Sequence, residues 1–307
     1  MASSYSTTGT RALARIRPEG QRKAARSVLV TGAAGRIGSY FAEHAQRRYR
    51  LRLMVQTEDQ VERVARFGET VVCQLDDLEG LKQACAGIDT VLHLAADPDA
   101  EAVWRDLLRD NIIGCYHAFV AAKSAGCRRV IFASSVHAVS GYRADVQVKT
   151  QDPVNPGDLY GVTKCFGEAL GRYMAEQEGL SVIAVRIGAF QSDEVARRPD
   201  SIHLLDAFVS QRDLHQLFCK AIDADNLRFA IFHGLSDNRF KRLDISDARE
   251  LLGYAPEDDA TELNPQVEPL HLKDRLMAHN LRGGQESGIR DDVKPATGKR
   301  RKARATR

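Results

Sequence analysis

A short apolar run followed by three regularly spaced glycines constrains the fold of this chain more than any other feature. Residues 28–31 have the composition of a buried strand, and Gly32, Gly35 and Gly38 follow directly, leading into the amphipathic segment 36–48. A strand that turns through such glycines into a helix leaves backbone N–H groups unpaired at the helix start, where they bind phosphate groups. The first strand and helix of the chain therefore predict a dinucleotide-binding turn.

Segments with strand-like and helix-like patterns alternate along most of the chain. Six short apolar runs have the composition of strands: 28–31, 51–55, 71–74, 90–94, 130–133 and 182–186. Between them lie segments whose apolar residues recur every three or four positions, as in helices: 36–48, 58–67, 78–86, 101–125 and 158–178. This alternation predicts an α/β fold, a doubly wound parallel sheet of the Rossmann type with helices on both faces.

The alternation becomes irregular after residue 186. Here the sequence predicts helices over 203–210 and 213–223, strands over 229–232 and 241–243, and a last helix from 244–246 to Gly253. These residues are too few to form an independent hydrophobic core. We therefore expect a dinucleotide-binding core over 27–190 and a short C-terminal substrate cap, integrated with that core, over 191–270.

Both ends of the chain are basic. Residues 1–26 carry six basic residues and one glutamate, and residues 290–307 carry eight basic residues and two aspartates, although the net charge is +3. We interpret 1–26 and 280–307 as disordered basic extensions. The alternatives are an organelle transit peptide at the N-terminus and nucleic-acid contact by the run 299–302, which lacks interleaved aromatic residues. The chain has no apolar run of about 18 residues, so we expect no membrane span and a cytoplasmic protein.

Tyr160 and Lys164 lie four residues apart, so a helix places both side chains on one face. A free tyrosine titrates near about 10, and a neighbouring ammonium group favours the phenolate and lowers that pKa. Ser135 follows a predicted strand and can hydrogen-bond a substrate oxygen. These three residues predict an enzyme in which Tyr160 accepts a substrate proton, assisted by Ser135 and Lys164, while a hydride is transferred.

Further motifs make the chain resemble the extended short-chain dehydrogenases/reductases, the NAD-dependent epimerase/dehydratase family. They are His-Leu-Ala-Ala at 93–96, Asn111, Phe-Ala-Ser-Ser at 132–135, Tyr-x-x-x-Lys at 160–164 and Arg-Ile-Gly at 186–188. The likeness covers about residues 27–255. It implies cofactor contacts by Gly32, Ala34, Gly35, Arg36, Ile37, Gly38, Gln56, Gln74, Leu75, Leu94, Ala95, Ala96, Asn111, Ser134, Tyr160, Lys164 and Ile187.

The choice between NAD and NADP depends on the residues that follow the second and third predicted strands. An acidic residue after the second strand binds the ribose hydroxyls and selects NAD, but Gln56 here neither repels nor attracts a 2′-phosphate. Similar proteins carry an aspartate facing the adenine where this chain has Gln74, whose side-chain carbonyl accepts the same hydrogen bond. Arg36 could bind either a 2′-phosphate or the pyrophosphate. We expect NAD, with NADP as the alternative.

Within the superfamily the chain is most similar to uronate dehydrogenases, which oxidise the anomeric carbon of a sugar acid to a lactone. The likeness is carried by residues 111–114, 132–137, 159–168, 185–188 and 252–256. It implies an NAD(P)-dependent oxidoreductase that acts on a sugar or sugar acid. The substrate would contact Ser135, His137 and His203.

Two departures from the uronate dehydrogenase pattern concern the substrate. Val136 replaces an asparagine that follows the catalytic serine, and His203 stands where the family uses an arginine to bind the carboxylate. Losing a bidentate arginine weakens carboxylate recognition, although Arg197 and Arg198 are close in sequence. The resemblance therefore leaves the identity of the sugar open.

Two other functions are compatible with the same fold. The first is a nucleotide-sugar epimerase or dehydratase, which usually has a larger C-terminal region and a Tyr-Gly-Pro-like turn that is missing after Arg186. The second is a non-catalytic dinucleotide-binding sensor, which usually lacks the Tyr–Lys pair present here. By analogy with similar enzymes, the helices predicted over 101–125 and 158–178 would form a homodimer interface. The six cysteines lack metal-ligand spacing, so we expect no metal site.

Overall fold

The computed structural model describes residues 25–270, and the basic extensions predicted over 1–26 and 280–307 lie almost entirely outside this range. Seven parallel strands form one sheet in the order β3-β2-β1-β4-β5-β6-β9. Strand order reverses between β1 and β4, so the predicted doubly wound α/β fold is confirmed. The strands are β1 (Ser27–Thr31), β2 (Arg50–Val55), β3 (Glu69–Val72), β4 (Thr90–His93), β5 (Arg129–Ser135), β6 (Ser181–Ile187) and β9 (Phe229–Gly234).

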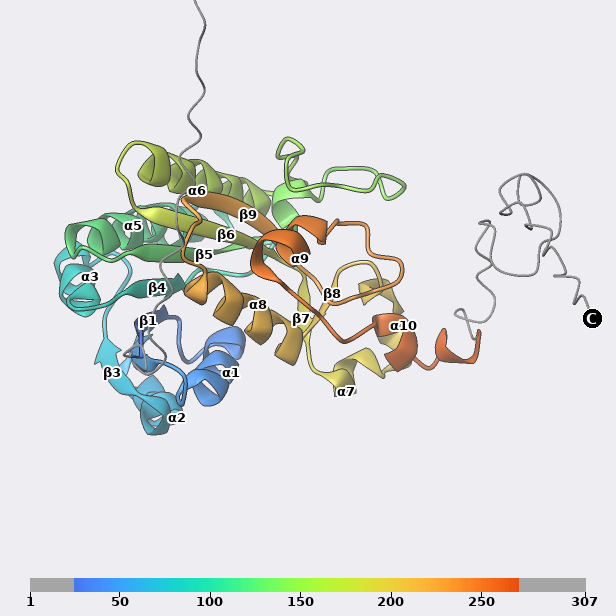
Figure 1. Cartoon of the computed structure of the whole chain (residues 1–307), viewed down its shortest axis with the longest axis horizontal. Helices are drawn as coiled ribbons and strands as arrows, with labels where there is room; N and C mark the ends of the chain where they lie inside the picture. The colour runs from blue at the N-terminus through green and yellow to red at the C-terminus, as the bar shows by residue number, and fades with distance from the viewer. Residues whose placement is uncertain (1–24, 271–307) are drawn as a thin grey trace, which may run out of the picture.

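Helices cover both faces of the sheet (Figure 1). One layer contains α3 (Leu78–Cys85), α5 (Gly114–Ser124) and α6 (Leu159–Glu176). The opposite layer contains α1 (Arg36–Ala45), α2 (Val61–Val64), α8 (Gln211–Asp223) and α9 (Ser246–Leu252). The central strands β4 and β5 are buried along their whole length, which explains why they read as continuous apolar runs.

Alternate residues of each strand belong to two separate hydrophobic cores. Val28 and Val30 of β1 pack in the core that contains Phe41 of α1, whereas Leu29 packs in the core that contains Phe119 of α5. The period of two along a strand therefore directs successive side chains into opposite layers.

The helix predicted over 203–210 is wrong. A single 3-10 segment (Pro199–Leu204) is followed by β8 (Phe208–Ser210), which pairs with β7 (Ala189–Gln191) in a separate small sheet. Phe208 and Val209 are completely buried there, so tertiary packing overrides an apolar spacing that also fits a helix. The strand predicted over 241–243 is reduced to one bridge between Val148 and Leu243.

Two other predicted helices are less regular than their spacing suggests. The segment 58–67 forms α2 between two 3-10 turns, Glu58–Gln60 and Ala65–Phe67. The segment 101–125 starts as α4 (Trp104–Leu107) and passes through a widened π-helical stretch, Leu108–Ile113, before α5. The last predicted helix is confirmed as α9, which ends at Gly253, whose φ of 63° is left-handed.

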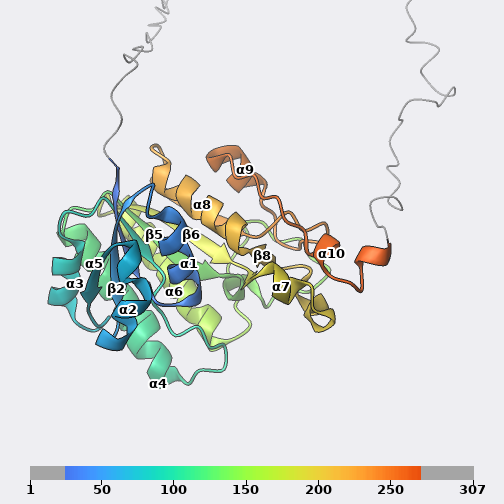
Figure 2. The same ribbon diagram turned by 90° about the horizontal axis from the view of Figure 1, so that it is seen from below.

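Part of the segment 191–270 projects beyond the end of the main sheet, where β7, β8, α7 (Asp193–Ala196) and α10 (Ala260–Leu263) lie together (Figure 2). The remainder belongs to the core, because α8 covers the sheet and β9 extends it. Within residues 25–270, no helix has the length and apolar character needed to cross a membrane.

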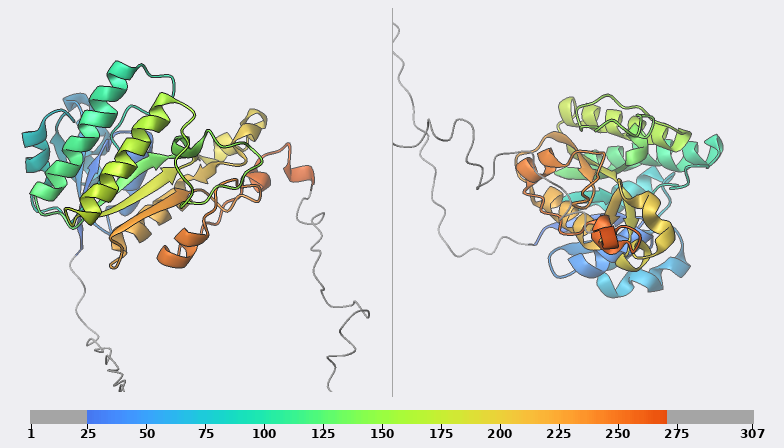
Figure 3. Two further views of the ribbon diagram at one scale, coloured as in Figure 1. Left: turned by 90° about the horizontal axis from the view of Figure 1, so that it is seen from above. Right: turned by 90° about the vertical axis from the view of Figure 1, so that its right-hand side faces the viewer.

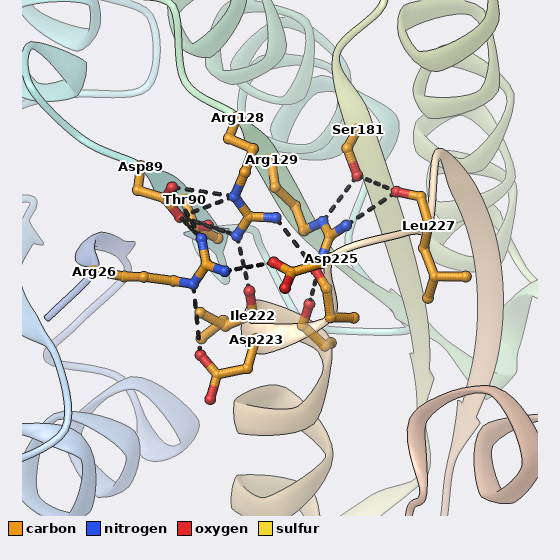
Figure 4. Close-up of polar contacts among 12 residues, drawn as sticks. Arg26, Asp89, Thr90, Arg128, Arg129, Ser181, Ile222, Asp223, Asp225 and Leu227 are labelled. Atoms are coloured by element: carbon orange, nitrogen blue, oxygen red, sulfur yellow. Dashed lines mark hydrogen bonds and ion pairs between the residues drawn. The ribbon is translucent and has the colours of Figure 1, made fainter. Parts of the chain in front are cut away.

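A cluster of arginine and aspartate side chains joins the amino ends of the strands, at the end opposite to the glycine turn (Figure 4). Asp89 accepts hydrogen bonds from Arg26 and Arg128, and Arg26 also pairs with Asp225 at 2.8 Å. Arg129 is fully buried and donates to carbonyl groups at the end of α8 and beyond it. Burial lowers the pKa of Arg129 to about 10. The cluster ties β1, β4 and β5 to the C-terminal end of α8, and it anchors Arg26, the last residue of the basic extension that the sequence predicts.

Candidate active site

A cavity of about 870 Å³ opens at the carboxyl ends of the strands, beside the point where strand order reverses. It is large enough for a dinucleotide, and Ser135 lines it together with every predicted cofactor contact except Asn111. Those lining residues are Gly32, Ala34, Gly35, Arg36, Ile37, Gly38, Gln56, Gln74, Leu75, Leu94, Ala95, Ala96, Ser134, Tyr160, Lys164 and Ile187.

The three glycines have different structural roles in the turn between β1 and α1. Gly32 has a φ of 67°, which side-chain-bearing residues rarely adopt. A Cβ atom on Gly38 would lie 2.3 Å from the Gly32 carbonyl oxygen, so only glycine lets α1 approach β1. α1 begins at Arg36 without a side-chain cap, so its first-turn N–H groups remain available to an anion. This turn fits the pyrophosphate of a dinucleotide.

Arg36 is directed toward the cap rather than toward the end of β2. Its guanidinium donates to the carbonyl oxygen of Phe190 at 2.8 Å and to Oε1 of Gln191 at 2.7 Å. These contacts join the glycine turn to β7 along the cavity wall. The geometry therefore gives no support to Arg36 as a ligand of a 2′-phosphate.

Asn111 is buried and supports the site without lining the cavity. Its side-chain carbonyl accepts a hydrogen bond from the backbone N–H of Asp97 at 2.8 Å, and its amide donates to the Asp97 carbonyl at 3.0 Å. The same amide donates to Thr163 Oγ1 at 3.2 Å. Asn111 thus holds the loop after β4 against α6, and its direct contact with the cofactor stays a prediction.

Ser135, Tyr160 and Lys164 meet at one end of the cavity. Ser135 ends β5, and α6 carries Tyr160 and Lys164 on the face that covers this strand. The Lys164 ammonium donates to the Ala133 carbonyl at 3.0 Å and lies 5.2 Å from the centre of the Tyr160 ring. Burial lowers the pKa of Lys164 to about 8. The trio predicted from sequence spacing is therefore assembled in space.

The pKa of Tyr160 is raised, in contrast to the lowering expected from a nearby lysine. Burial is the main cause, and the negative charge of Asp158 adds to it, whereas a hydrogen bond with Ser135 acts in the opposite direction. Spacing along the helix shows that Lys164 is near, but it does not reveal how strongly the surrounding protein disfavours the phenolate.

His137 lies beside Tyr160, outside the cavity lining. Its ring stands edge-on to the Tyr160 ring, with centroids 5.3 Å apart, and its Nδ1 lies 2.6 Å from Oδ2 of Asp158. The other carboxylate oxygen of Asp158 caps α6 by accepting from the Gly161 N–H at 2.7 Å. His137 is thus well placed to contact a substrate that projects from the cavity.

The cap candidates lie farther from the trio. His203 is exposed, with Nδ1 bound to the Asp200 carbonyl, and it does not line the cavity. Arg198 pairs with Asp200 at 3.0 Å on the surface, and Arg197 ends α7. The structure therefore does not bring these three residues together with Ser135 and Tyr160.

The sequence reasoning missed several residues of the site. Asp158 had a recognisable signal, because an aspartate immediately before a helix is a favoured N-cap. Arg63 of α2 and Gln191 of β7 line the cavity but belong to no local motif. Among residues 25–270, no group of three or more His, Cys, Asp or Glu residues could hold a metal ion.

The reversed strand order, the glycine turn and the cavity beside it define a Rossmann-type dinucleotide-binding protein. Residues 28–224 match the model of the NAD dependent epimerase/dehydratase family, and the chain belongs to this family. The resemblance inferred from the sequence motifs is confirmed.

Several similar proteins are dehydrogenases of sugars and sugar acids. The chain is 34% identical over 258 residues to an NAD-dependent glucose-6-phosphate dehydrogenase of Haloferax volcanii, covering 79% of this chain and 97% of that one. It is 28% identical over 241 residues to a uronate dehydrogenase of Pseudomonas putida, covering 78% and 87%. A crystal structure of a uronate dehydrogenase mutant from Agrobacterium tumefaciens complexed with NAD superposes with a TM-score of 0.69 at 28% identity, covering 83% and 91%.

Proposed function

We propose that the protein is an NAD-dependent dehydrogenase that oxidises a hydroxyl group of a sugar or sugar acid. The meeting of Ser135, Tyr160 and Lys164 in the cavity that also contains the glycine turn carries this proposal. The activities of the similar proteins support the same substrate class. NAD, when bound, supplies the nicotinamide ring that accepts the hydride.

Ser135, Tyr160 and Lys164 have separate roles in the reaction. Ser135 donates a hydrogen bond to the substrate oxygen and holds it near the phenolate oxygen of Tyr160. Tyr160 accepts the hydroxyl proton as the neighbouring C–H bond breaks. Lys164 is held by the Ala133 carbonyl and places a positive charge beside the tyrosine ring, which favours the phenolate form of Tyr160 that accepts the proton.

The two ends of the cavity suggest separate binding roles. The residues predicted to contact the cofactor bind the dinucleotide along the carboxyl ends of β1 to β6, while Asn111 fixes the adjoining loop. The substrate contacts Ser135 and His137, and the segment 191–270 covers it. His203, Arg197 and Arg198 do not line this cavity.

The protein forms a homodimer through α5 and α6 and acts in the cytoplasm. The two helices lie side by side on one face of the sheet (Figure 3, left). Large apolar side chains are exposed along these helices and along the segment 104–113 that precedes them, and exposed apolar surface is a feature of protein–protein interfaces. They are Trp104, Ile113, Tyr116, Leu159, Val162 and Tyr173.

Reduction of the dinucleotide, followed by absorbance, tests the proposed activity. NAD and NADP are each supplied with uronic acids, neutral aldoses and sugar phosphates. Turnover with one sugar class that is abolished by Tyr160→Phe supports the proposal, since this variant retains the ring and loses only the acidic hydroxyl. Tight dinucleotide binding without turnover of any of these sugars contradicts it.

A further inference from the structure

Three glutamine side chains form the end of the cavity that follows β2 and β3. Gln56 and Gln74 hydrogen-bond to each other, with the Gln74 amide donating to the Gln56 carbonyl oxygen at 2.7 Å and the side-chain amides 3.2 Å apart. Oε1 of Gln60 accepts from the backbone N–H of Gln56 at 3.0 Å. All three residues line the cavity, and their side chains are polar and uncharged.

An uncharged residue at the end of β2 has a direct consequence for cofactor choice. In a Rossmann site, a carboxylate at this position binds the 2′-hydroxyl of the adenosine ribose and repels a phosphate on the same oxygen. Gln56 provides no such repulsion. The position therefore admits a 2′-phosphate if a positive charge is near enough to compensate it.

Arg63 supplies that charge. It lies one helical turn after Gln60 and lines the same cavity, and its side chain makes no hydrogen bond or ion pair with any residue in 25–270. The other arginines of the lining are engaged elsewhere: Arg36 binds β7, and Arg109 pairs with Asp110 through two hydrogen bonds. Asp76 is the opposing charge in the lining near Gln74.

We propose that Gln56 and Arg63 form a subsite for the 2′-phosphate of NADP, so that the protein accepts NADP as well as NAD. The inference rests on the dinucleotide site of the proposed function. Arginine suits this role because its planar guanidinium donates two parallel hydrogen bonds to a phosphate. The negative charge of Asp76 weakens the binding of a 2′-phosphate. The enzyme should therefore accept both NAD and NADP rather than NADP alone.

Calorimetric titration of the full chain with 2′,5′-ADP and 5′-AMP tests the subsite without any sugar substrate. A charge-assisted phosphate contact predicts that 2′,5′-ADP binds about tenfold more tightly than 5′-AMP. Arg63→Gln is expected to remove this preference, and Gln56→Asp to reverse it. Arg66→Gln is the matched control, because Arg66 stacks on Phe67 outside the cavity lining and should retain the preference.

Each outcome separates the subsite from the proposed activity. Equal binding of the two nucleotides by the unmodified protein, or a preference that survives Arg63→Gln, overturns the subsite while leaving the dehydrogenase proposal intact. Failure of both nucleotides to bind overturns the dinucleotide site itself. A preference that depends on Arg63 supports the subsite, even if no sugar is turned over.

Discussion

Glu168 of α6 binds Arg186 of β6 through both carboxylate oxygens, with two hydrogen bonds of 2.8 Å, in the interior of the protein. The same carboxylate accepts a hydrogen bond from Ser134 at 2.6 Å. Glu168 lies one turn after Lys164, so its ion pair with Arg186 fixes α6 against β6, and its hydrogen bond with Ser134 fixes α6 against β5, the strand that ends in Ser135.

Replacing Glu168 by glutamine should destabilise the fold, because it leaves the buried Arg186 charge without a counter-ion. We expect the free energy of unfolding to fall by about 3 kcal/mol in urea denaturation. The matched control is Glu176→Gln on the same helix, since its ion pair with Arg172 is exposed and should contribute less than about 1 kcal/mol. Equal effects of the two substitutions would show that the buried pair contributes no more than a surface pair.

Lys164→Met should abolish turnover and stabilise the protein at neutral pH. Burial lowers the lysine pKa from 10.5 to about 8, so below that value keeping the buried ammonium protonated costs about 3 kcal/mol. Losing the hydrogen bond to the Ala133 carbonyl costs about 1 kcal/mol, which leaves an expected gain of about 2 kcal/mol in urea denaturation.

The same linkage predicts how stability changes with pH. Between the folded pKa of about 8 and the unfolded value of 10.5, the unfolded chain binds more protons at Lys164. The contribution of this residue to the free energy of unfolding therefore rises with pH across that window. The free energy of unfolding is measured against pH for the unmodified protein and for Lys164→Met. The difference between the two curves gives the contribution of Lys164. A flat difference profile would contradict the lowered pKa.

Alanine substitutions in the glycine turn should separate folding from cofactor binding. A Cβ atom on Gly38 would meet the backbone at 2.3 Å and 2.8 Å, so Gly38→Ala should destabilise the fold by about 1–3 kcal/mol. On Gly35 the nearest atom is 3.2 Å away, so Gly35→Ala should fold but obstruct the pyrophosphate. Thermal unfolding and NAD titration of both variants would measure the two effects. Equal losses of thermal stability and of NAD affinity in the two variants would refute these separate roles.

Asp158→Asn should shift the pH dependence of kcat/KM for oxidation toward lower pH. The aspartate charge raises the pKa of Tyr160, and asparagine removes that charge while preserving the N-cap of α6. The ascending limb of kcat/KM in the oxidation direction should therefore move to lower pH. An unchanged limb would mean that Tyr160 does not control this ionisation, whereas lost stability would point to the cap instead.

Tyr116→Glu should convert the proposed dimer into a monomer, because it places a charge among the exposed apolar side chains of α4, α5 and α6. Light scattering after size-exclusion chromatography would report the mass of each species. Leu251→Glu is the matched control, since Leu251 is a similarly exposed apolar residue on α9, in the opposite helical layer. A monomeric unmodified protein, or an unchanged dimer after Tyr116→Glu, would rule out this interface.

Sequence reasoning succeeded where the signal is local. The glycine spacing and the four-residue separation of Tyr160 and Lys164 each follow from one strand or helix, and the structure assembles them as expected. The β8 strand could not be predicted in this way, because Phe208 becomes a strand residue only through pairing with Ala189. Arg36 likewise turns toward the cap because of Phe190, which lies 154 positions away.

The arginine–aspartate cluster has a consequence for how the chain folds during synthesis. Arg26 pairs with Asp225, 199 positions later, and Arg129 donates to carbonyl groups of the same late segment. A nascent chain therefore cannot complete the cluster until α8 has left the ribosome, and β9 must follow to cover β6. Until then Arg129 lacks its hydrogen-bond acceptors. The domain should therefore fold as a whole late in translation, and its N-terminal half should not reach the native structure first.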